Sequence, residues 1–358
     1  MPGLHTTQVK QLGGITLSPY STTLPDNELQ GYVSEIIGDD ISNILWLHSD
    51  SSNTVPPLHD QFSGIGNLQL LNNILDANKF LRKVNVMLDK NGYFILLVET
   101  KKSRKSRIYG NYSKIARRPV YIFDFLWKRV VPKTFLRGIY FAITRGKKQV
   151  VSLSEALARL IFCGFEIIDH KQIGNKTVII SKKIQLPYRL VVPTTGILIK
   201  LPRVGFNKEI ISVYKIRTMH PYSEFLQEYL FDKYGTKDGD KIENDFRVTR
   251  WGKFFRKYWI DEIPMLLNLV KGDLKIIGVR PLSRHKFYTY PDDLQRERVN
   301  YKPGLIPPYY ADLPETQEEF FESEKKYLRQ YQENPLKTDL KYLGKFIYNI
   351  IFKGVRSK

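Results

Sequence analysis

The sequence predicts an α/β protein with two domains. Its 358 residues suit two domains at roughly 100–200 residues each. Helical patterns alternate with short apolar runs in the first half, which favours strands covered by helices. A proline-containing segment over residues 185–195 then separates that half from one with different motifs. We therefore expect a first domain over 1–184, a linker over 185–195 and a second domain over 196–358.

The composition excludes several classes of protein. The single cysteine, Cys163, rules out a disulfide framework and a cysteine-rich zinc site, and the six histidines show no metal-binding spacing. We find no apolar run of about 18 residues, and hence no ordinary transmembrane helix. The first residues also lack the apolar core of a signal peptide. We expect a protein kept in the reducing cytoplasm that can still lie on a membrane surface.

The first domain begins with apolar segments of two kinds. Residues 41–48 (ISNILWLH) are typical of a buried strand. Residues 68–84 carry apolar side chains at helical spacing, which predicts a helix. Asn91-Gly92 predicts a turn, and residues 93–99 (YFILLVE) predict a strand of a parallel sheet covered on both faces.

The first domain ends with a predicted helix and hairpin. Residues 154–162 have an amphipathic pattern with Ser152 as the N-cap. Gly164 should end this helix, and the strands 165–169 and 177–181 should pair across a turn at Gly174-Asn175.

That order of elements resembles the C-terminal half of a class I methyltransferase fold, through "DKNGYFILLVE" and "SLSEALARLIFCGFEIID". The family's glycine-rich methyl-donor loop is absent before Ile41, and residues 63–67 (SGIGN) carry only two glycines. The resemblance thus implies a degenerate methyltransferase-like domain with a docking or structural role. A methyltransferase acting on glycan or lipid is an alternative that methyl-donor binding would reveal.

A strongly basic segment interrupts this pattern. The net charge is +20, and residues 101–150 contribute 15 lysines and arginines against one acid, Asp124. Aromatic residues are interleaved with the cations, which favours contact with anionic lipid headgroups. The alternatives are a charged insertion whose aromatic rings pack inward, and nucleic-acid binding. We expect no nucleic-acid partner, because no nucleic-acid motif accompanies the charge.

Basic motifs surround the predicted elements at the start of the second domain. Arg203 precedes the strand predicted over residues 210–216, which runs into Lys215 and Arg217. Arg247 lies in the later motif "NDFRVTRWG". Trp251, Phe254, Phe255 and Tyr258 then follow the spacing of one apolar helix face.

Two adjacent carboxylates follow that helix. Asp261 and Glu262 stand before Pro264, and proline favours the first turn of a helix, here the apolar helix expected over residues 265–270. The helix dipole there would favour ionised carboxylates. An ionised aspartate can attack phosphorus, and a neighbouring carboxylate can hold Mg²⁺. The simpler alternative is that the acids only cap the helix.

Further cations lie beside glycine turns downstream. Arg280-Pro281 follows Gly278, and Lys302 precedes Pro303-Gly304. Arginine binds phosphate oxygens bidentately. A carboxylate pair among such groups indicates a pyrophosphate substrate bound with a metal.

Together these motifs resemble the bacterial sugar transferase family, the monotopic polyprenyl phosphoglycosyl transferases. The likeness is carried by "RVG", "VYKIRTM", "NDFRVTRWGKFFRKYWIDEIPMLLNLVKGDLKIIGVRPL" and "KPGL", and extends over residues 196–358. It implies an α+β second domain that moves a sugar-1-phosphate from a UDP-sugar to a polyprenyl phosphate, such as undecaprenyl phosphate. Such transfer starts exopolysaccharide, capsule or lipopolysaccharide assembly at the cytoplasmic face of the bacterial inner membrane.

The resemblance also implies roles for individual residues. Asp261 would be the nucleophile, Glu262 the Mg²⁺ ligand, and Arg256 would orient the pair. Arg280, Pro281, Lys215 and Arg217 would bind phosphate and nucleotide. Arg203 and Arg247 complete the predicted substrate-binding set.

The chain departs from the family pattern at defined places. The hydrophobic re-entrant helix that normally precedes "RVG" is replaced by the first domain. The usual Asp-Glu-x-Pro-Gln ends here in Met265, the usual Gly-Pro-Arg-Pro reads Gly-Val-Arg-Pro, and the run after Gly304 is "LIPPYY". Peripheral membrane contact would therefore come from residues 101–150, from the basic amphipathic segment 340–358, or from a glycan-assembly partner. The alternative for residues 340–358 is a helix that packs on the second domain. The alternative to an enzyme is a diverged scaffold or regulator of a glycan-assembly complex.

Overall fold

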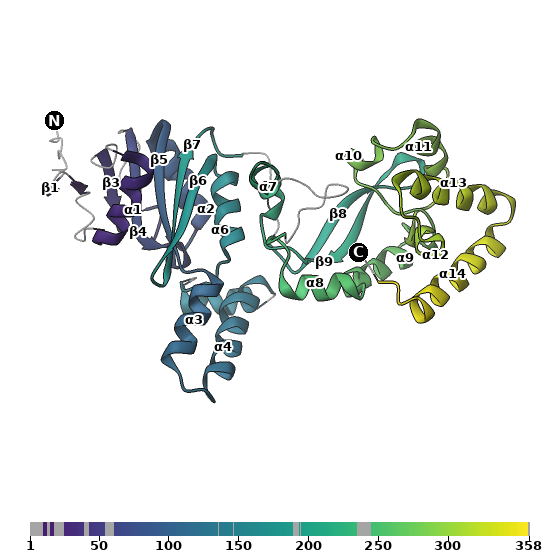
Figure 1. Ribbon diagram of the computed structural model, residues 1–358, viewed down its shortest axis with the longest axis horizontal. Coiled ribbons are helices and arrows are strands. Elements are labelled where there is room, and N and C mark those ends of the chain that lie inside the picture. Colours follow the sequence, from purple (N-terminus) through teal and green to yellow (C-terminus); the bar gives the residue numbers. More distant parts are fainter. Residues whose placement is uncertain are drawn as a thin grey trace. The chain divides into compact units, whose positions relative to one another are not determined.

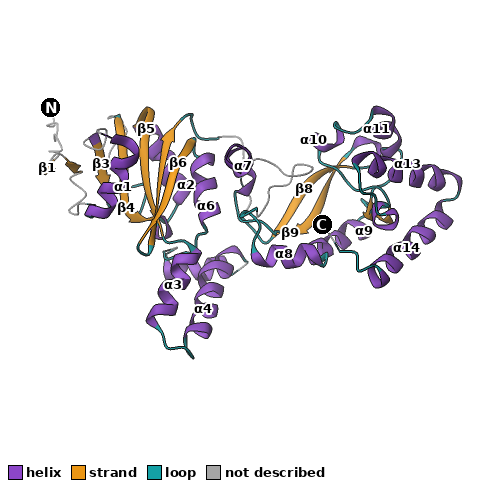
Figure 2. Ribbon diagram, in the orientation of Figure 1, coloured by secondary structure: helices purple, strands orange, loops and turns teal. Residues whose placement is uncertain are grey.

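The protein folds into two compact units that interleave in sequence. The computed structural model describes residues 10–12, 15–17, 25–38, 43–53, 61–134, 136–145, 147–188, 193, 195–234 and 245–356. The first unit comprises Met1–Thr195 and His220–Arg247, and the second Gly196–Met219 and Val248–Lys358. Figure 1 and Figure 2 show helices and strands alternating along the chain, so the predicted α/β class is confirmed.

A seven-stranded mixed sheet forms the centre of the first unit. Its order is β1-β2-β3-β4-β5-β7-β6. The parallel strands are β2 to β5, while β7 pairs antiparallel with both β5 and β6. The strands span Lys10–Leu12 (β1), Ile15–Leu17 (β2), Ile44–Leu47 (β3), Phe62–Leu70 (β4), Leu88–Val98 (β5), Phe165–Ile173 (β6) and Lys176–Lys183 (β7).

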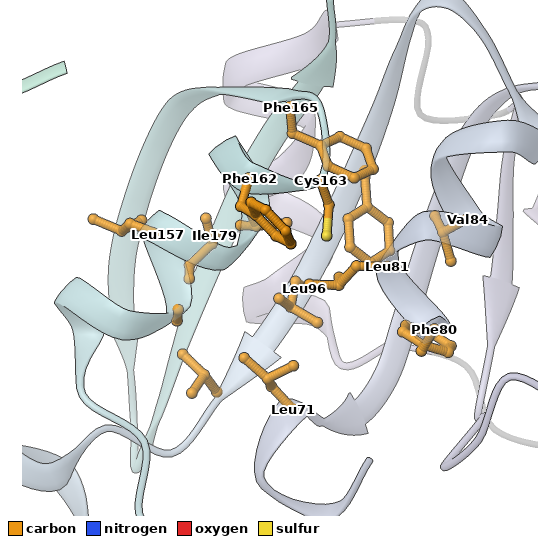
Figure 3. Packing of buried hydrophobic residues seen from close by; sticks show 14 of the residues in the cluster. Leu71, Phe80, Leu81, Val84, Leu96, Leu157, Phe162, Cys163, Phe165 and Ile179 are labelled. Atoms are coloured by element: carbon orange, nitrogen blue, oxygen red, sulfur yellow. The ribbon is translucent and has the colours of Figure 1, made fainter. Parts of the chain in front are cut away.

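Helices cover both faces of this sheet because successive strand side chains point to opposite sides. Ile44 and Trp46 pack with α1 (Asn27–Ile37) in one buried cluster, whereas Leu45 and Leu47 belong to the other. That second cluster holds α2 (Ala77–Met87) and α6 (Leu153–Phe162), and Figure 3 shows its packing around Phe162 and Cys163.

The segment His220–Arg247 joins the first unit through the same core. Tyr222, Leu226 and Leu230 are buried with Phe162 in the cluster on the α6 side. They come from a 3-10 turn, Ser223–Leu226, its preceding residue, and α7 (Gln227–Tyr234). The Tyr222 hydroxyl accepts hydrogen bonds from the side chains of Asn78 and Arg159.

Several predicted elements of the first domain are confirmed. The strands at Ile44–Leu47 and in the second half of β5 are present and buried. Ser152 caps α6, because its hydroxyl accepts a hydrogen bond from the Glu155 amide. The hairpin of β6 and β7 turns at Gly174-Asn175.

Two local predictions are wrong. Residues 68–70 belong to β4, and the helix begins only at Ala77, where the Asp76 carboxylate caps it by accepting from the Lys79 amide. Asn91-Gly92 lies within β5, at an irregular register with β4, and Asn91 has φ 68°. The two glycines of residues 63–67 lie in β4, and a Cβ at Gly66 would stand 2.4 Å from the Trp46 ring. Gly66 therefore leaves room for the Trp46 ring to pack against β4.

The basic insertion is helical. It comprises α3 (Lys101–Asn111), α4 (Arg117–Phe125), a π-helical turn at Leu126–Val130, a 3-10 turn at Val131–Lys133 and α5 (Arg137–Thr144). In Figure 1, α3 and α4 extend away from one end of the sheet. Part of the predicted linker, residues 189–192 and 194, lies outside the described residues.

The second unit packs helices around two small sheets. β8 (Leu198–Val204) and β9 (Ile210–Ile216) form an antiparallel hairpin, and β10 (Lys275–Ile277) pairs parallel with β11 (Gly304–Ile306). The helices are α8 (Arg250–Lys257), α9 (Leu266–Val270), α10 (Arg284–Phe287), α11 (Asp292–Arg298), α12 (Tyr309–Asp312), α13 (Gln317–Glu333) and α14 (Pro335–Phe352). None of the described helices combines the length and apolarity that a bilayer crossing requires.

Candidate active site

The β8–β9 hairpin carries two cations of the candidate site. Arg203 lies near the end of β8, and Lys215 lies near the end of β9. Burial lowers the pKa of both side chains, and the Arg280 guanidinium lowers the pKa of Arg203 further by repulsion. Closely spaced cations that repel one another favour an anionic ligand between them.

The buried side chain of Asn268 fastens α9 to β9. Its Oδ1 accepts from the Tyr214 amide at 3.0 Å, and its Nδ2 donates to the Ser212 carbonyl at 2.8 Å and to Asp273 Oδ2 at 2.9 Å. These bonds are sheltered from water because Asn268 is 0% exposed. They hold the carboxylate-bearing turn before α9 against the strand that carries Lys215.

Helix α8 approaches the second unit's backbone closely. Thr249 caps the helix, and the Gly252 amide donates to the Thr249 hydroxyl at 2.8 Å. A Cβ at Gly252 would lie 2.0 Å from the Thr218 carbonyl oxygen, so only glycine fits there. Near the end of α8, Arg256 Nε donates to the Thr218 hydroxyl at 2.9 Å.

Asp261 and Glu262 lie in a 3-10 helix, Ile260–Met265, that runs into α9. The left-handed backbone of Trp259 (φ 55°) turns the chain from α8 into this helix. Asp261 is 8% exposed. The expected helix after Pro264 is present, although the proline lies inside the 3-10 helix and not in the first turn of α9.

The electrostatics of Asp261 differ from the expectation that a helix dipole favours its ionised form. Burial raises the pKa of Asp261 above its ordinary value, and the Glu262 carboxylate raises it further. Lys215 and, more weakly, Arg256 oppose this rise. The charged form of a buried acid is disfavoured by desolvation, and a short 3-10 helix offers little dipole to offset it.

Lys215 and Glu262 form an ion pair within the site. Lys215 Nζ donates to Glu262 Oε1 at 2.6 Å, and both side chains are less than one-fifth exposed. A charge-assisted bond of this length in a partly dry site fixes both groups in place. The pair therefore sets the position of the carboxylate that the sequence marks as a metal ligand.

Gly278 and Gly304 allow a close approach of two backbone segments beside Arg280, which lines the same pocket as Lys215 and Glu262. A Cβ at Gly304 would lie 2.1 Å from the Gly278 amide nitrogen, so the backbone just after β10 meets the first residue of β11 with no side chain between them. Arg280 follows directly, and its Nη1 donates to the Tyr309 hydroxyl at 3.0 Å. Tyr309 raises the pKa of Arg280, with Glu262 adding to the rise, so this guanidinium stays charged.

These elements enclose a pocket with a cavity volume of about 60 Å³. Three cations and one carboxylate line it, namely Arg203, Lys215, Arg280 and Glu262. Its remaining lining residues are Val213, Met265, Pro281, Gly304, Leu305, Pro307, Tyr309 and Tyr310. The excess of positive charge suits an anionic group such as a phosphate.

The other predicted site residues lie elsewhere. Neither Asp261 nor Arg256 lines the pocket. Asp261 directly precedes the lining residue Glu262, and the Arg256 charge acts on the pKa of Asp261. Arg217 Nε donates to the Gly196 carbonyl at 2.8 Å. Arg247 belongs to the first unit, where its guanidinium is paired with Asp245 at 2.7 Å.

Sequence reasoning missed the aromatic wall of the pocket. Tyr310 accepts a hydrogen bond from Trp259 Nε1 at 3.1 Å, and both rings contact Phe346 of α14. The signal available was the run "LIPPYY", which departs from the family pattern at this point. Asn268 and Thr218 were missed as well, since their contacts are made with distant backbone.

The described part of the site offers few oxygen donors for Mg²⁺. No group of three or more metal-binding side chains occurs among the described residues. The Glu262 carboxylate nevertheless faces the pocket with oxygen donors, and Mg²⁺ is usually held by one or two carboxylates together with substrate phosphates. The residues present fit that sparse mode of binding.

Comparison with known proteins identifies the domain that carries this site. Residues 178–353 match the bacterial sugar transferase family. The chain is 38% identical over 104 residues to the galactosyl transferase CpsE of Streptococcus agalactiae, covering 29% of this chain and 23% of that protein. It is 36% identical over 108 residues to the undecaprenyl-phosphate galactose phosphotransferase of Salmonella typhimurium, covering 29% and 22%.

A third relative extends the match. The UDP-N-acetylgalactosamine-undecaprenyl-phosphate N-acetylgalactosaminephosphotransferase of Aeromonas hydrophila is 33% identical over 144 residues, which covers 34% of this chain and 31% of that protein. The chain thus spans less than one-third of the length of these three relatives. The matched segment nevertheless contains every residue that lines the pocket. Residues 178–353 of this chain therefore belong to the bacterial sugar transferase family.

Proposed function

We propose that the chain is a phosphoglycosyl transferase that moves a sugar-1-phosphate from a UDP-sugar to a polyprenyl phosphate at the cytoplasmic face of the bacterial inner membrane. The observation that supports this most is the pocket that Arg203, Lys215 and Arg280 line together with Glu262, the neighbour in sequence of the buried Asp261. Three cations in one small cavity match the charge of a diphosphate. The names of the Salmonella and Aeromonas relatives state undecaprenyl phosphate as their lipid substrate.

The chemistry would proceed in two displacements. A carboxylate oxygen of Asp261 forms a bond to the phosphorus that carries the sugar, while the bond from that phosphorus to the oxygen of UMP breaks and UMP leaves. An oxygen of the polyprenyl phosphate then attacks the same phosphorus. The bond to Asp261 breaks, which regenerates the carboxylate and releases a polyprenyl diphosphate sugar.

The surrounding residues would lower the barrier by electrostatics. Arg280 and Lys215 neutralise the phosphate oxygens so that an anionic nucleophile can approach. Arg256, fixed by its bond to Thr218, orients the carboxylate pair. Mg²⁺, held by Glu262 and the substrate phosphates, would supply further charge neutralisation.

The test is transfer and covalent capture with purified full-length protein. With UDP-galactose or UDP-N-acetylgalactosamine, Mg²⁺ and undecaprenyl phosphate in detergent, UMP should be released. Without the acceptor, intact-mass measurement should show one added sugar phosphate per chain. The Asp261→Asn variant should lose both signals, whereas Asp292→Asn, a change at an exposed acid of α11, should keep them.

The results separate this enzyme from its alternative. A non-catalytic scaffold would bind UDP-sugar without releasing UMP, and its chain mass would stay unchanged across a panel of donors. UMP release that persists in Asp261→Asn would reject the proposed nucleophile.

A further inference from the structure

The helical insertion of the first unit exposes apolar side chains at helical spacing. In and just after α4, Ile122, Phe123 and Leu126 are exposed, with Phe123 at 69%. At α5, Leu136, Ile139 and Ile143 repeat the pattern, with Ile143 at 66%. Such spacing places each set on one side of its helix. Exposed apolar faces of this kind mark interaction sites.

On the inner side of the same insertion, charged side chains are paired with one another or with neighbouring elements. Arg104 donates to Glu99 and to Asp124, and Lys128 donates to Asp124. Arg129 donates to Glu155 of α6, and the Tyr140 ring is completely buried against Trp127. These contacts hold the helices of the insertion together and tie them to Glu99, just after β5, and to α6. The fold therefore determines which faces of the insertion remain exposed.

Cations without carboxylate partners accompany the apolar faces. Lys102, Lys114, Arg118, Arg145 and Lys148 are all exposed. Within the part of the insertion that the structure describes, none of these five side chains takes part in an ion pair. The nearby carboxylates of Glu99, Asp124 and Glu155 already form ion pairs with arginines on the inner side of the insertion. The insertion thus presents unneutralised positive charge beside exposed isoleucine and phenylalanine.

We propose that the described residues of the helical insertion between 101 and 148 form a membrane-docking element that binds the surface of an anionic lipid bilayer. Phosphate headgroups complement the exposed cations, and the acyl boundary receives Phe123, Ile139 and Ile143. Nucleic acid would match the charge but gives no apolar medium to aliphatic side chains. The element belongs to the first unit and is separate from the candidate pocket, so the inference stands whether or not the chain transfers phosphosugar.

The decisive experiment places a polarity-sensitive fluorophore on the full-length protein. Phe123→Cys or Ile143→Cys would be labelled with a nitrobenzoxadiazole maleimide and mixed with phosphatidylglycerol vesicles or with phosphatidylcholine vesicles. The native thiol should not interfere, because burial raises the pKa of Cys163 to about 12. Both labels should shift to shorter wavelength with phosphatidylglycerol and less with phosphatidylcholine. A label at Val86→Cys, an exposed position on α2, should not shift.

Vesicle sedimentation supplies the affinity. Ile122→Ser with Phe123→Ser should weaken binding about tenfold, which corresponds to ~1.4 kcal/mol. Lys114→Gln with Arg118→Gln should weaken it by about fivefold per cation at low salt, with a smaller effect at high salt. The matched control, Leu75→Ser with Val86→Ser, removes apolar side chains of similar exposure from the other part of the unit and should leave binding unchanged.

Two results would overturn the proposal. The first is vesicle binding of the full chain with both insertion labels still in a water-like environment, which would assign binding to another segment such as α14. The second is a spectral shift of the labels with duplex DNA and none with phosphatidylglycerol. Loss of UMP release with retained label shifts would reject only the proposed enzyme activity.

Discussion

Replacing Gly252 with alanine should disturb both the fold and the chemistry of the second unit. The added Cβ would lie 2.0 Å from the Thr218 carbonyl oxygen, whereas ordinary contact begins at 3.4 Å. Helix α8 must therefore move by about 1.4 Å, the difference between these two distances. The Thr218 oxygen is backbone, so it cannot rotate away as a flexible side chain would.

The movement would break a set of short hydrogen bonds. The Thr249 amide donates to the Thr218 carbonyl at 2.9 Å, and Arg256 Nε donates to the Thr218 hydroxyl at 2.9 Å. Overpacking typically costs about 1–3 kcal/mol, and each lost hydrogen bond about 1 kcal/mol. We therefore expect Gly252→Ala to lower the free energy of unfolding by about 3 kcal/mol. Displacing Arg256 by about 1 Å should also slow UMP release by about a hundredfold.

Three measurements test this prediction with a matched control. Urea unfolding gives the change in stability, hydrogen exchange of the α8 amides localises it, and UMP release gives the rate. Gly344→Ala in α14 is the control, because no atom lies within 4 Å of its added Cβ. That change should stabilise the helix by about 0.5–1 kcal/mol and leave the rate unaltered. If Gly252→Ala behaves like Gly344→Ala in all three measurements, the close approach of α8 to Thr218 is not needed by the protein.

Three further predictions concern single side chains of the second unit. Asn268→Ala removes three hydrogen bonds and should lower the unfolding free energy by about 3 kcal/mol in urea, with Leu336→Ala at an exposed position as a near-neutral control. Burial lowers the pKa of Lys275 from 10.5 to about 8. Between these two pH values the unfolded chain therefore binds more protons at this side chain than the folded protein does. Its unfolding free energy should therefore rise between pH 8 and 10, and Lys275→Met should flatten that rise. Lys215→Met removes the main group that opposes the raised pKa of Asp261, so the acid limb of the UMP-release profile should move to higher pH. An unmoved acid limb would show that Asp261 does not limit the rate.

The parts of the fold that the sequence predicted are those with strong local signals. Ser152 at an N-cap and the glycine turn between β6 and β7 determine their elements through neighbouring residues alone. Residues 68–76 were misassigned because their apolar positions fit a helical period, while pairing of β4 with β5 extends the strand to Leu70. Long-range pairing of this kind overrides local periodicity, and no local pattern reports it.

The same difference between local and long-range signals holds for the candidate site. Lys215, Glu262 and Arg280 lie in recognisable motifs, and all three line one pocket. Tyr309 and Met265 also line it, yet neither has a residue type that predicts phosphate chemistry. Arg247 stands only three residues before α8 in the sequence, but it belongs to the first unit because the chain leaves the second unit at Met219 and returns at Val248.

The Lys215–Glu262 pair explains how a pocket of about 60 Å³ can hold concentrated charge. A buried cation without a partner would be costly, so the carboxylate occupies the place of an anion and keeps the ammonium in position. In the proposed function, the diphosphate of the donor would bring more negative charge than one carboxylate and would compete with Glu262 for Lys215. In the proposed function, that exchange would free the Glu262 oxygens for the metal that the phosphates bring. The pair therefore keeps Lys215 partnered and in position within the pocket.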